Sequence, residues 1–399
     1  MRRLPAAFFW LLASWLCWGA HGAYGHELTG YLETEGRLFP ESPLFEQQRF
    51  NDVSLAAAPE YYHAFENGSS VTAVLFGRLD SADRHRTHAD IRELKFLYLA
   101  DDWELTVGVD RVFWGVTEFY HLADIINQTD LVEEISGDEK LGQPMAHLSV
   151  PMDWGVVDLF VMPWFREITF PGPHGRLRFG IPINTDDPIY ESPAEQSHVD
   201  VAVRYSHTIG DVDFGIYQFY GTARQPTMVP ALTSLGELEL RPFYQIVSQT
   251  GLDAQLVLGQ WLLKLESIYR VGQGDPYYSG TGGFEYTLVA VVDTSMDLGI
   301  LMEYAYDQRG NRAFTYYQDD IVFGLRLAVN DAAGSELLLG AGYDFENRTK
   351  LVSLEASRRL SDHFKLSVKS AFFLDVGPND ILYDLRRDSF IRLLLRYYF

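Results

Sequence analysis

The stretch Asp297-Leu298-Gly299-Ile300-Leu301-Met302-Glu303-Tyr304-Ala305-Tyr306-Asp307 decides the fold of this chain, because apolar side chains alternate along most of it with acidic and small ones. Successive side chains of an extended strand point to opposite faces, so this period of two gathers most of the apolar residues on one face. The same period recurs near residues 197–208, 317–330 and 363–375. The sequence therefore predicts long strands with one apolar and one polar face.

Three features favour lipid over a protein core as the partner of the apolar faces. The predicted strands are about 9–13 residues long, the length of a tilted strand that crosses a membrane. Aromatic residues collect at strand ends, as at Tyr304, Tyr306, Phe372 and Phe373, where membrane barrels carry aromatic girdles. The polar faces are rich in glycine and charge, which suits a water-filled interior. We expect an all-β fold, a transmembrane antiparallel up-and-down β-barrel, with a soluble β-sandwich as the alternative.

Counting these patterns gives about 18 strands, an even number as in bacterial single-chain barrels, with about 16 as the alternative. The predicted strands are 27–39, 51–65, 70–79, 87–99, 102–112, 143–151, 154–165, 197–208, 211–221, 245–258, 260–271, 282–292, 296–307, 317–330, 335–345, 348–360, 363–375 and 387–399. The weakest assignment is 237–258, where residues 241–252 form either a strand of their own or part of a loop. Acids just before strand starts predict short turns at one end of the barrel. Long polar stretches predict loops at the other end, at 113–142, 167–196, 222–238, 273–281 and 308–316.

The N-terminus has the features of a secretory signal peptide. Two arginines precede an almost uninterrupted apolar run from Leu4 to Ala20, and small residues that suit cleavage follow. We expect a signal peptide over residues 1–22, with cleavage after residue 22 or after residue 25, and an N-terminal membrane anchor as the alternative. Residues 23–399 would then form a single barrel domain. Cys17, the only cysteine, would be removed, so the mature chain could form no intramolecular disulfide.

The chain is acidic, since 32 lysines and arginines stand against 55 aspartates and glutamates for a net charge of −23. This balance lacks the basic surface that nucleic acids require, so we expect no nucleic-acid partner. Two arginines leave with the predicted signal peptide, which changes the charge from −23 to −25. If the lumen carries its share of the acids, a channel through it would prefer cations.

The last residues, Ile391-Arg392-Leu393-Leu394-Leu395-Arg396-Tyr397-Tyr398-Phe399, alternate in the same way and end in an aromatic side chain. With Tyr397 two residues before the terminal Phe399, this strand resembles the C-terminal insertion signal of Gram-negative outer-membrane barrels. The resemblance implies export through the periplasm, insertion into the cell outer membrane by the barrel assembly machinery, and contact with outer-membrane lipid and lipopolysaccharide. An ordinary closing strand is the alternative. A homo-oligomer is compatible with the pattern, because a subunit interface and a lipid face are both apolar.

A shorter region carries a second resemblance. A stretch that contains Gly108, Trp114 and Gly115 is followed by residues 124–130, which read Asp-Ile-Ile-Asn-Gln-Thr-Asp. Together they resemble the Trp-Gly segment and the Asp-Ile-Asn-Pro-type loop of a porin-like family of uncharacterised function, with a departure at Gln128, where that family often has proline. The resemblance implies a porin-like barrel and does not indicate a solute. A more distant similarity to polysaccharide-export barrels rests on architecture alone.

The predicted loop 113–142 is the first candidate for a functional site, because a loop of this length in a compact protein is usually functional. Its apolar spacing fits one or two short helices, and folded inward it would narrow the lumen. The polar residues that it would present there are Asp124, Asn127, Asp130, Glu133, Glu134, Asp138 and Glu139. The alternative is a solvated loop whose acids face water.

A second candidate, residues 163–178, is rich in proline and glycine and carries Arg166, Arg176 and Arg178. If these arginines faced the acidic loop across the lumen, the opposed charges would create a transverse field that orients charged solutes. The alternative is a set of ordinary salt bridges at the rim of the barrel.

No motif indicates catalysis, a metal or a cofactor. The chain has no Gly-x-Ser-x-Gly elbow, no Asp-x-Asp-x-Asp-Gly calcium loop, no His-Glu-x-x-His pair and no heme-attaching Cys-x-x-Cys-His motif. We therefore expect no metal, no cofactor and no enzymatic activity, and a channel for passive diffusion of small solutes that prefers cations. The alternatives are an outer-membrane subunit or scaffold of an export or electron-transfer complex and, less favoured, a barrel hydrolase.

Overall fold

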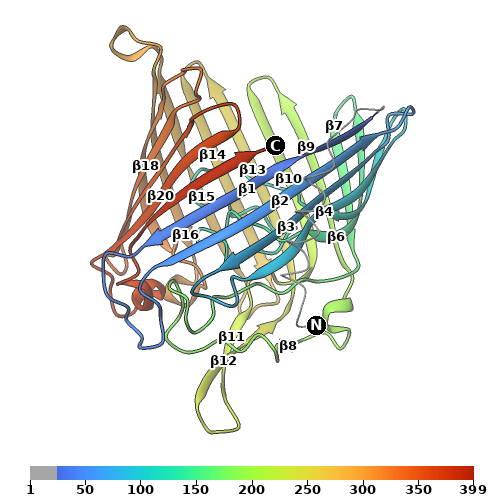
Figure 1. Cartoon of the computed structure of the whole chain (residues 1–399). Helices are drawn as coiled ribbons and strands as arrows, with labels where there is room; N and C mark the ends of the chain where they lie inside the picture. Colours follow the sequence, from blue (N-terminus) through green and yellow to red (C-terminus); the bar gives the residue numbers. More distant parts are fainter. Residues whose placement is uncertain (1–24) are drawn as a thin grey trace.

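A computed structural model describes residues 25–399, whose strands close into an 18-stranded antiparallel barrel (Figure 1). Closure comes from the pairing of β1 (His26–Leu38) with β21 (Phe390–Tyr398). Every other wall strand pairs with the wall strands before and after it in the chain. The predicted all-β up-and-down barrel of about 18 strands is confirmed. The predicted signal peptide, residues 1–22, lies outside the described residues.

The wall strands follow the alternating pattern of the sequence closely. Besides β1 and β21 they are β2 (Asp52–Ala64), β3 (Ser70–Asp80), β4 (His88–Leu99), β5 (Glu104–Asp110), β6 (Gln143–Met152), β7 (Gly155–Met162), β9 (Asp200–Ile209), β10 (Val212–Thr222), β13 (Ile246–Leu258), β14 (Trp261–Val271), β15 (Tyr277–Leu288), β16 (Asp297–Asp307), β17 (Asp319–Ala328), β18 (Glu336–Asp344), β19 (Lys350–Arg359) and β20 (Phe364–Leu374). Each overlaps a predicted strand. The start of β15 differs, since it begins at Tyr277 and reduces the predicted loop 273–281 to residues 272–276.

A small second sheet lies at one end of the barrel (Figure 1). It consists of β8 (Ile189–Tyr190), β11 (Thr227–Leu232) and β12 (Leu238–Tyr244). The ambiguous stretch 237–258 therefore contains two strands, β12 outside the wall and β13 within it. The remaining regular elements of the described chain are short 3-10 turns at Glu195–Ser197, Val291–Asp293, Gly310–Arg312 and Ile381–Leu385. No helix in residues 25–399 is long and apolar enough to cross a membrane.

The two ends of the barrel differ in the length of their connections. Short turns join strands at one end, where Gly210 and Gly259 adopt φ of +61° and +63°, a conformation that favours glycine. The other end, the long-loop end, has shorter connections at 81–87, 272–276 and 345–349. The long connections at this end are 39–51, 111–142, 163–199, 223–245, 308–318 and 375–389. The first and last of these were not among the predicted long loops.

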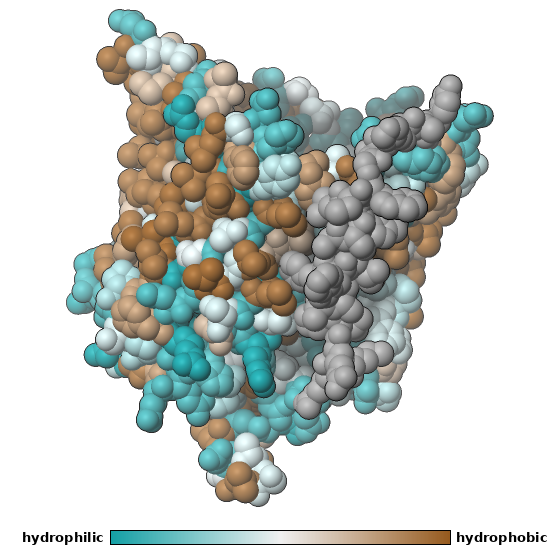
Figure 2. All heavy atoms as spheres, viewed as in Figure 1, coloured by the Kyte–Doolittle hydropathy of each residue, from teal (hydrophilic) through white to brown (hydrophobic). Residues whose placement is uncertain are grey.

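The wall is apolar outside and polar inside. On β9, Val201 and Val203 are exposed on the outer face, whereas Asp200 and Ala202 are buried on the inner one. Figure 2 shows hydrophobic side chains gathered over the wall and mostly hydrophilic ones around the long-loop end. Because the sheet is closed, each wall strand has a partner on both sides for its backbone hydrogen bonds, as a strand in hydrocarbon requires.

Candidate functional site

Residues 111–142, which connect β5 to β6, form a crossing segment that runs through the lumen. Its hydrogen bonds reach β14 and β16 on one side and β3, β4 and β21 on the other. Ala123, Ile126 and Asp130 are inaccessible to solvent although they lie outside regular structure. The crossing segment therefore lies inside the barrel, and most of it is not a solvated surface loop.

The short helices predicted for this segment are not formed. Its backbone contains turns and isolated β-bridges, as between Thr129 and Lys140. In a helix the backbone N–H groups donate to carbonyl groups of the same helix. Several N–H groups of this segment instead donate hydrogen bonds to carboxylates of the wall. Of the apolar side chains that suggested a helix, Leu122, Ile125 and Ile126 pack on the wall, whereas Leu131 packs against the connection 163–199 and the external sheet.

Glu266 of β14 binds the backbone of the first half of the crossing segment. The carboxylate accepts hydrogen bonds from the N–H groups of Val116 at 2.8 Å, Thr117 at 3.0 Å and Ala123 at 2.7 Å, and from the Thr117 hydroxyl at 2.6 Å. Glu266 is 0% exposed. Hydrogen bonds to an ionised acceptor are stronger than neutral ones, and burial strengthens them further.

Glu303 of β16 holds the next two residues in the same way. Its carboxylate accepts hydrogen bonds from the N–H groups of Glu118 at 2.6 Å and Phe119 at 3.0 Å. The Phe119 ring lies against the wall at Gly324 and Gly340, where an added Cβ would come within 2.9 and 3.0 Å of the ring. We name Glu266 and Glu303 the far anchor.

Trp114 fixes the start of the segment by packing. Its ring centroid lies 5.4 Å from that of Phe160 and 4.8 Å from that of Tyr217, and the Arg204 guanidinium lies 5.1 Å from the Trp114 ring. Gly115 follows with φ of +148°, and an added Cβ would lie 3.0 Å from Glu266 Oε1. The Trp-Gly pair thus places an aromatic ring on the wall and lets the backbone approach the far anchor closely.

Gly115→Ala is expected to loosen the crossing segment without opening the wall, because it strains the backbone and pushes on the Glu266 carboxylate. Limited proteolysis of the folded barrel should cut within 111–142 several times faster than in the unaltered protein. Gly236→Ala is the control, since Gly236 also has positive φ, at +80°, but nothing lies within 4 Å of an added Cβ. Equal cleavage of both variants would contradict the role of Gly115.

Asn127 ties the two ends of the crossing segment together. Its side-chain amide donates to the carbonyl oxygens of Asp110 at 2.8 Å and Leu141 at 2.9 Å, and its side-chain oxygen accepts from the Val112 N–H at 2.8 Å. Two buried carbonyl groups and one half-buried N–H group are thereby satisfied. Asn127 therefore has a structural role at the base of the segment.

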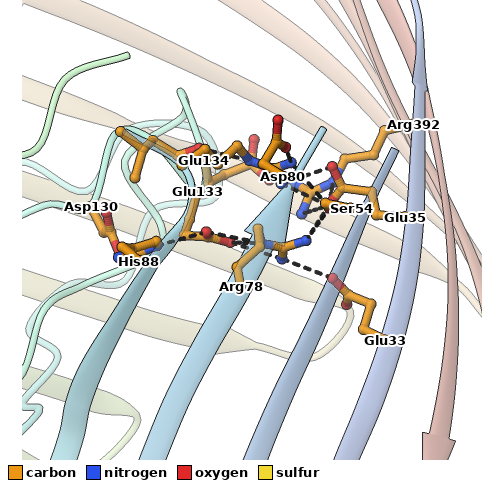
Figure 3. A network of polar contacts seen from close by, with 12 residues as sticks. Glu33, Glu35, Ser54, Arg78, Asp80, His88, Asp130, Glu133, Glu134 and Arg392 are labelled. Atoms are coloured by element: carbon orange, nitrogen blue, oxygen red, sulfur yellow. Dashed lines mark hydrogen bonds and ion pairs between the residues drawn. The ribbon is translucent and has the colours of Figure 1, made fainter. Parts of the chain in front are cut away.

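On the opposite wall, Arg78 of β3 lies at the centre of a buried charged cluster (Figure 3). Its Nε donates to both carboxylate oxygens of Glu133 at 2.9 Å, its Nη2 lies 2.9 Å from Glu33, and its Nη1 donates to the Ser54 hydroxyl at 2.6 Å. The nearby carboxylate of Glu35 is 2.8 Å from Arg86. We name the wall side chains of this cluster the near anchor, and its remaining members are Arg37, Arg92 and Arg392.

Two further acids of the crossing segment bind the near anchor. Asp130 is 2.6 Å from Arg92, and Glu134 is 2.6 Å from Arg392. Arg92 occupies a β-bulge, because Leu75 pairs with Ile91 while Val74, the preceding residue, pairs with Glu93. Bulges redirect side chains at functional positions. Here the bulge leaves Arg92 free of a ladder partner and directed at Asp130.

Glu133 stays ionised at neutral pH. Burial alone would raise the pKa of Glu133, but the charge of Arg78, a hydrogen bond from His88 and the charge of Arg86 hold this pKa below its usual value. A lowered carboxyl pKa stabilises the folded state above the unfolded pKa of about 4.3. That stabilisation is lost as the pH falls from there towards the folded pKa.

Asp138 and Glu139 of the predicted acids are exposed. The structure brings the other four acids into the lumen, where each faces a cation. Asp124 lies 3.2 Å from Lys140. The other three pair with arginines of the near anchor. Because paired charges largely cancel at a distance, these acids contribute little to the field along the lumen.

The predicted arginines do not oppose these acids. Arg166 lies 2.7 Å from Asp90, and Arg176 lies 2.6 Å from Asp388. Arg178 donates to the carbonyl oxygens of its neighbours at residues 179 and 180. All three belong to the connection 163–199 at the long-loop end, whereas the acids dock on wall strands. In the described chain their cations come from β3, β4, β20 and β21, and from Lys140 of the segment itself.

The far and near anchors were missed by sequence reasoning. The sequence feature that could have indicated them is a charged residue at an inward position of an otherwise apolar strand, as at Arg78, Glu266 and Glu303. Alternation shows that such a side chain points inward. It does not show which group from another part of the chain it meets.

The lumen is water-accessible from its middle to the end with short turns. Inward side chains there are partly exposed, with Arg326 at 36%, Glu355 at 48% and Lys365 at 32%. Inward groups nearer the long-loop end, such as Glu35 and Glu266, are fully buried. The interior is therefore open to water towards the short turns and filled where the crossing segment lies.

A closed barrel with an apolar outer wall, a charged lumen and an inward-folded connection defines a porin-like fold. No family model matches the chain, and no curated protein matches its sequence. Among solved structures, a BenF-like porin from Pseudomonas fluorescens Pf-5 matches with 10% identity and a TM-score of 0.54, over 94% of this chain and 97% of that one. OccK11 (OpdR) of Pseudomonas aeruginosa matches with 12% identity and a TM-score of 0.51, over 94% and 95% of the two chains. At these identities the similarity is one of fold.

Proposed function

We propose that this protein is a channel of the Gram-negative outer membrane for passive diffusion of small solutes, narrowed by the crossing segment. The observation that carries the proposal is a water-accessible, charged lumen with one connection anchored across it at both sides. The apolar outer wall supports a place in lipid, and the porin fold of the two similar structures supports a channel. The proposed role is not enzymatic and uses no cofactor.

The remaining partners belong to the same proposal. They are outer-membrane lipid, lipopolysaccharide, the barrel assembly machinery and, through the apolar wall, a second copy of the chain. The outward position of Tyr397 on the closing strand β21 supports the insertion signal that ends at Phe399. Gly108, with φ of +136°, sits where an added Cβ would lie 2.2 Å from the Leu94 carbonyl oxygen. This crowding gives a physical reason for glycine in the motif that suggested the Trp-Gly family, whose membership stays a prediction.

The cation preference also stays a prediction. The net charge of −23 favours it. Asp124, Asp130, Glu133 and Glu134 of the crossing segment lend it little support, because each is paired. Any preference would arise from unpaired acids elsewhere along the path.

The first test is a planar-bilayer recording of refolded residues 23–399 under a salt gradient. Discrete conductance steps are expected, and the reversal potential reports the ion preference. Heat-modifiable migration in gels controls for a folded barrel. A folded barrel that passes no current would overturn the channel proposal and favour the alternative of a scaffold or a subunit of an export or electron-transfer complex.

A further inference from the structure

A cavity of about 200 Å³ lies between the crossing segment and the connections at the long-loop end. Its lining is mainly apolar and aromatic, with Tyr120, Ile125, Phe170, Tyr277, Phe314 and Tyr317 among its members. Small-molecule sites are typically apolar hollows with a few convergent polar groups. The size suits a small organic molecule.

A wider hollow of about 690 Å³ adjoins this cavity and shares Gln225, Tyr277, Arg309, Phe314 and Ile381 with it. Its lining also includes exposed loop residues at positions 275 and 311. Amide side chains are frequent there, at Gln225, Gln245, Gln273, Gln308, Asn311 and Asn379. The inner cavity thus adjoins a polar mouth at the long-loop end, with the shared side chains between them.

Arg270 is the unbalanced charge of the inner cavity. It is 7% exposed, and within the described chain its hydrogen bonds go to the amide oxygens of Gln249 at 2.6 Å and Gln273 at 3.3 Å, with no carboxylate within 4.0 Å. A buried cation without a counter-ion costs free energy. A bound anion would remove that cost.

The other cations of the lining already have counter-ions. Arg309 is 2.8 Å from Asp307, Lys140 is 3.2 Å from Asp124, and Arg224 is 2.7 Å from Asp200. One positive charge is therefore left over. This balance favours a ligand with a single negative charge.

Tyr277 adds a hydrogen-bond donor beside this charge. It is 3% exposed, and its hydroxyl has no partner within the described chain. Its ring centroid lies 5.8 Å from the Arg270 guanidinium and 3.8 Å from that of Arg309. A buried hydroxyl without a partner is costly, so it is expected to gain from a ligand acceptor.

We propose that this cavity binds a small monocarboxylate with an apolar or aromatic body. The carboxylate lies at Arg270 and the Tyr277 hydroxyl, and the body contacts the apolar lining between the crossing segment and the long connections. The inference rests on the proposed function, because it names the class of solute that the channel admits.

Binding is tested by calorimetry on refolded residues 23–399 in detergent, with phenylacetate, 2-phenylacetamide and acetate as probes. Phenylacetate is expected to bind saturably. The amide lacks the charge and acetate lacks the ring, so each should bind at least about tenfold more weakly, a difference of about 1.4 kcal/mol. Equal binding of the amide or of acetate would overturn the proposal.

Variants locate the site. Arg270→Gln should weaken phenylacetate binding about tenfold or more, and Arg270→Lys, which keeps the charge, should weaken it less. Arg358→Gln is the control, because that side chain is 60% exposed and lies outside the cavity lining. If Arg270→Gln fails to fold, the comparison of the three probes on the unaltered protein decides. Unchanged binding to a folded Arg270→Gln protein would overturn the assignment.

Failure of this inference can be told apart from failure of the channel proposal. Binding in detergent does not require conduction. A barrel that conducts but binds no phenylacetate would overturn the inference alone. A barrel that binds phenylacetate but passes no current would overturn the channel and keep the site.

Discussion

Exchanging both residues of the far anchor, Glu266→Gln with Glu303→Gln, is expected to raise the conductance of the channel several-fold. Each of the six hydrogen bonds that these carboxylates accept from the crossing segment would lose its charge assistance. Charge-assisted bonds are roughly twice as strong as neutral ones, so the combined loss is about 3 kcal/mol or more. Every 1.4 kcal/mol shifts the balance between docked and undocked segment by about tenfold. The undocked segment would leave the lumen wider.

The measurement is single-channel recording of the refolded double variant. Glu355→Gln is the matched control, because Glu355 also faces the lumen but is 48% exposed and pairs with Lys369 of the wall, at 3.1 Å. That control should leave the step size almost unchanged. A folded double variant with the step size of the unaltered protein would show that the crossing segment does not limit the current.

Arg78→Met is expected to have the largest effect on stability. It removes the cation shared by Glu33, Glu35 and Glu133, all of which are almost fully buried. Removing one partner of a buried ion pair typically costs about 3–5 kcal/mol, because the remaining charge is left uncompensated. The loss should shrink at acid pH, where the stranded carboxylates can take up protons.

Urea unfolding in detergent, followed by tryptophan fluorescence, measures this loss. Lys350→Met is the control, since Lys350 and Asp375 form an ion pair that is 50% and 68% exposed, and exposed pairs contribute about 0–1 kcal/mol. An Arg78→Met protein that unfolds at the same urea concentration as the control would show that the cluster is not a source of stability.

The barrel could be predicted from the sequence because its signal is local. A strand with water on one face and an apolar environment on the other shows a period of two within its own residues. Residues 297–307 alone therefore predict β16. The exceptions have local reasons too. β12 alternates like a wall strand although it belongs to the external sheet, and the start of β15 is a run of Tyr, Ser and Gly without clear alternation.

The site was predictable only in part, because its contacts join distant segments. Length and acidity made the connection that carries Asp130, Glu133 and Glu134 a candidate for folding inward, with a solvated loop as the alternative. Arg78 and Arg92 lie 55 and 38 residues before their partners Glu133 and Asp130, and Arg392 lies 258 residues after Glu134. The alternation of their strands does not reveal these partners. Apart from the Thr117 hydroxyl, the far anchor binds backbone N–H groups, which every residue except proline possesses. The side-chain pattern of residues 116–123 therefore could not reveal it.

The two anchors also imply an order of events during folding. The near anchor combines side chains from β1, β3, β4 and β21, so it is complete only after the first and last strands have paired. The far anchor requires β14 and β16 to be in place as well. Contacts between residues so far apart in the chain form late, because long stretches must be ordered first. We expect the crossing segment to dock last. In a folding intermediate whose first and last strands have not yet paired, the crossing segment would then not fill the lumen.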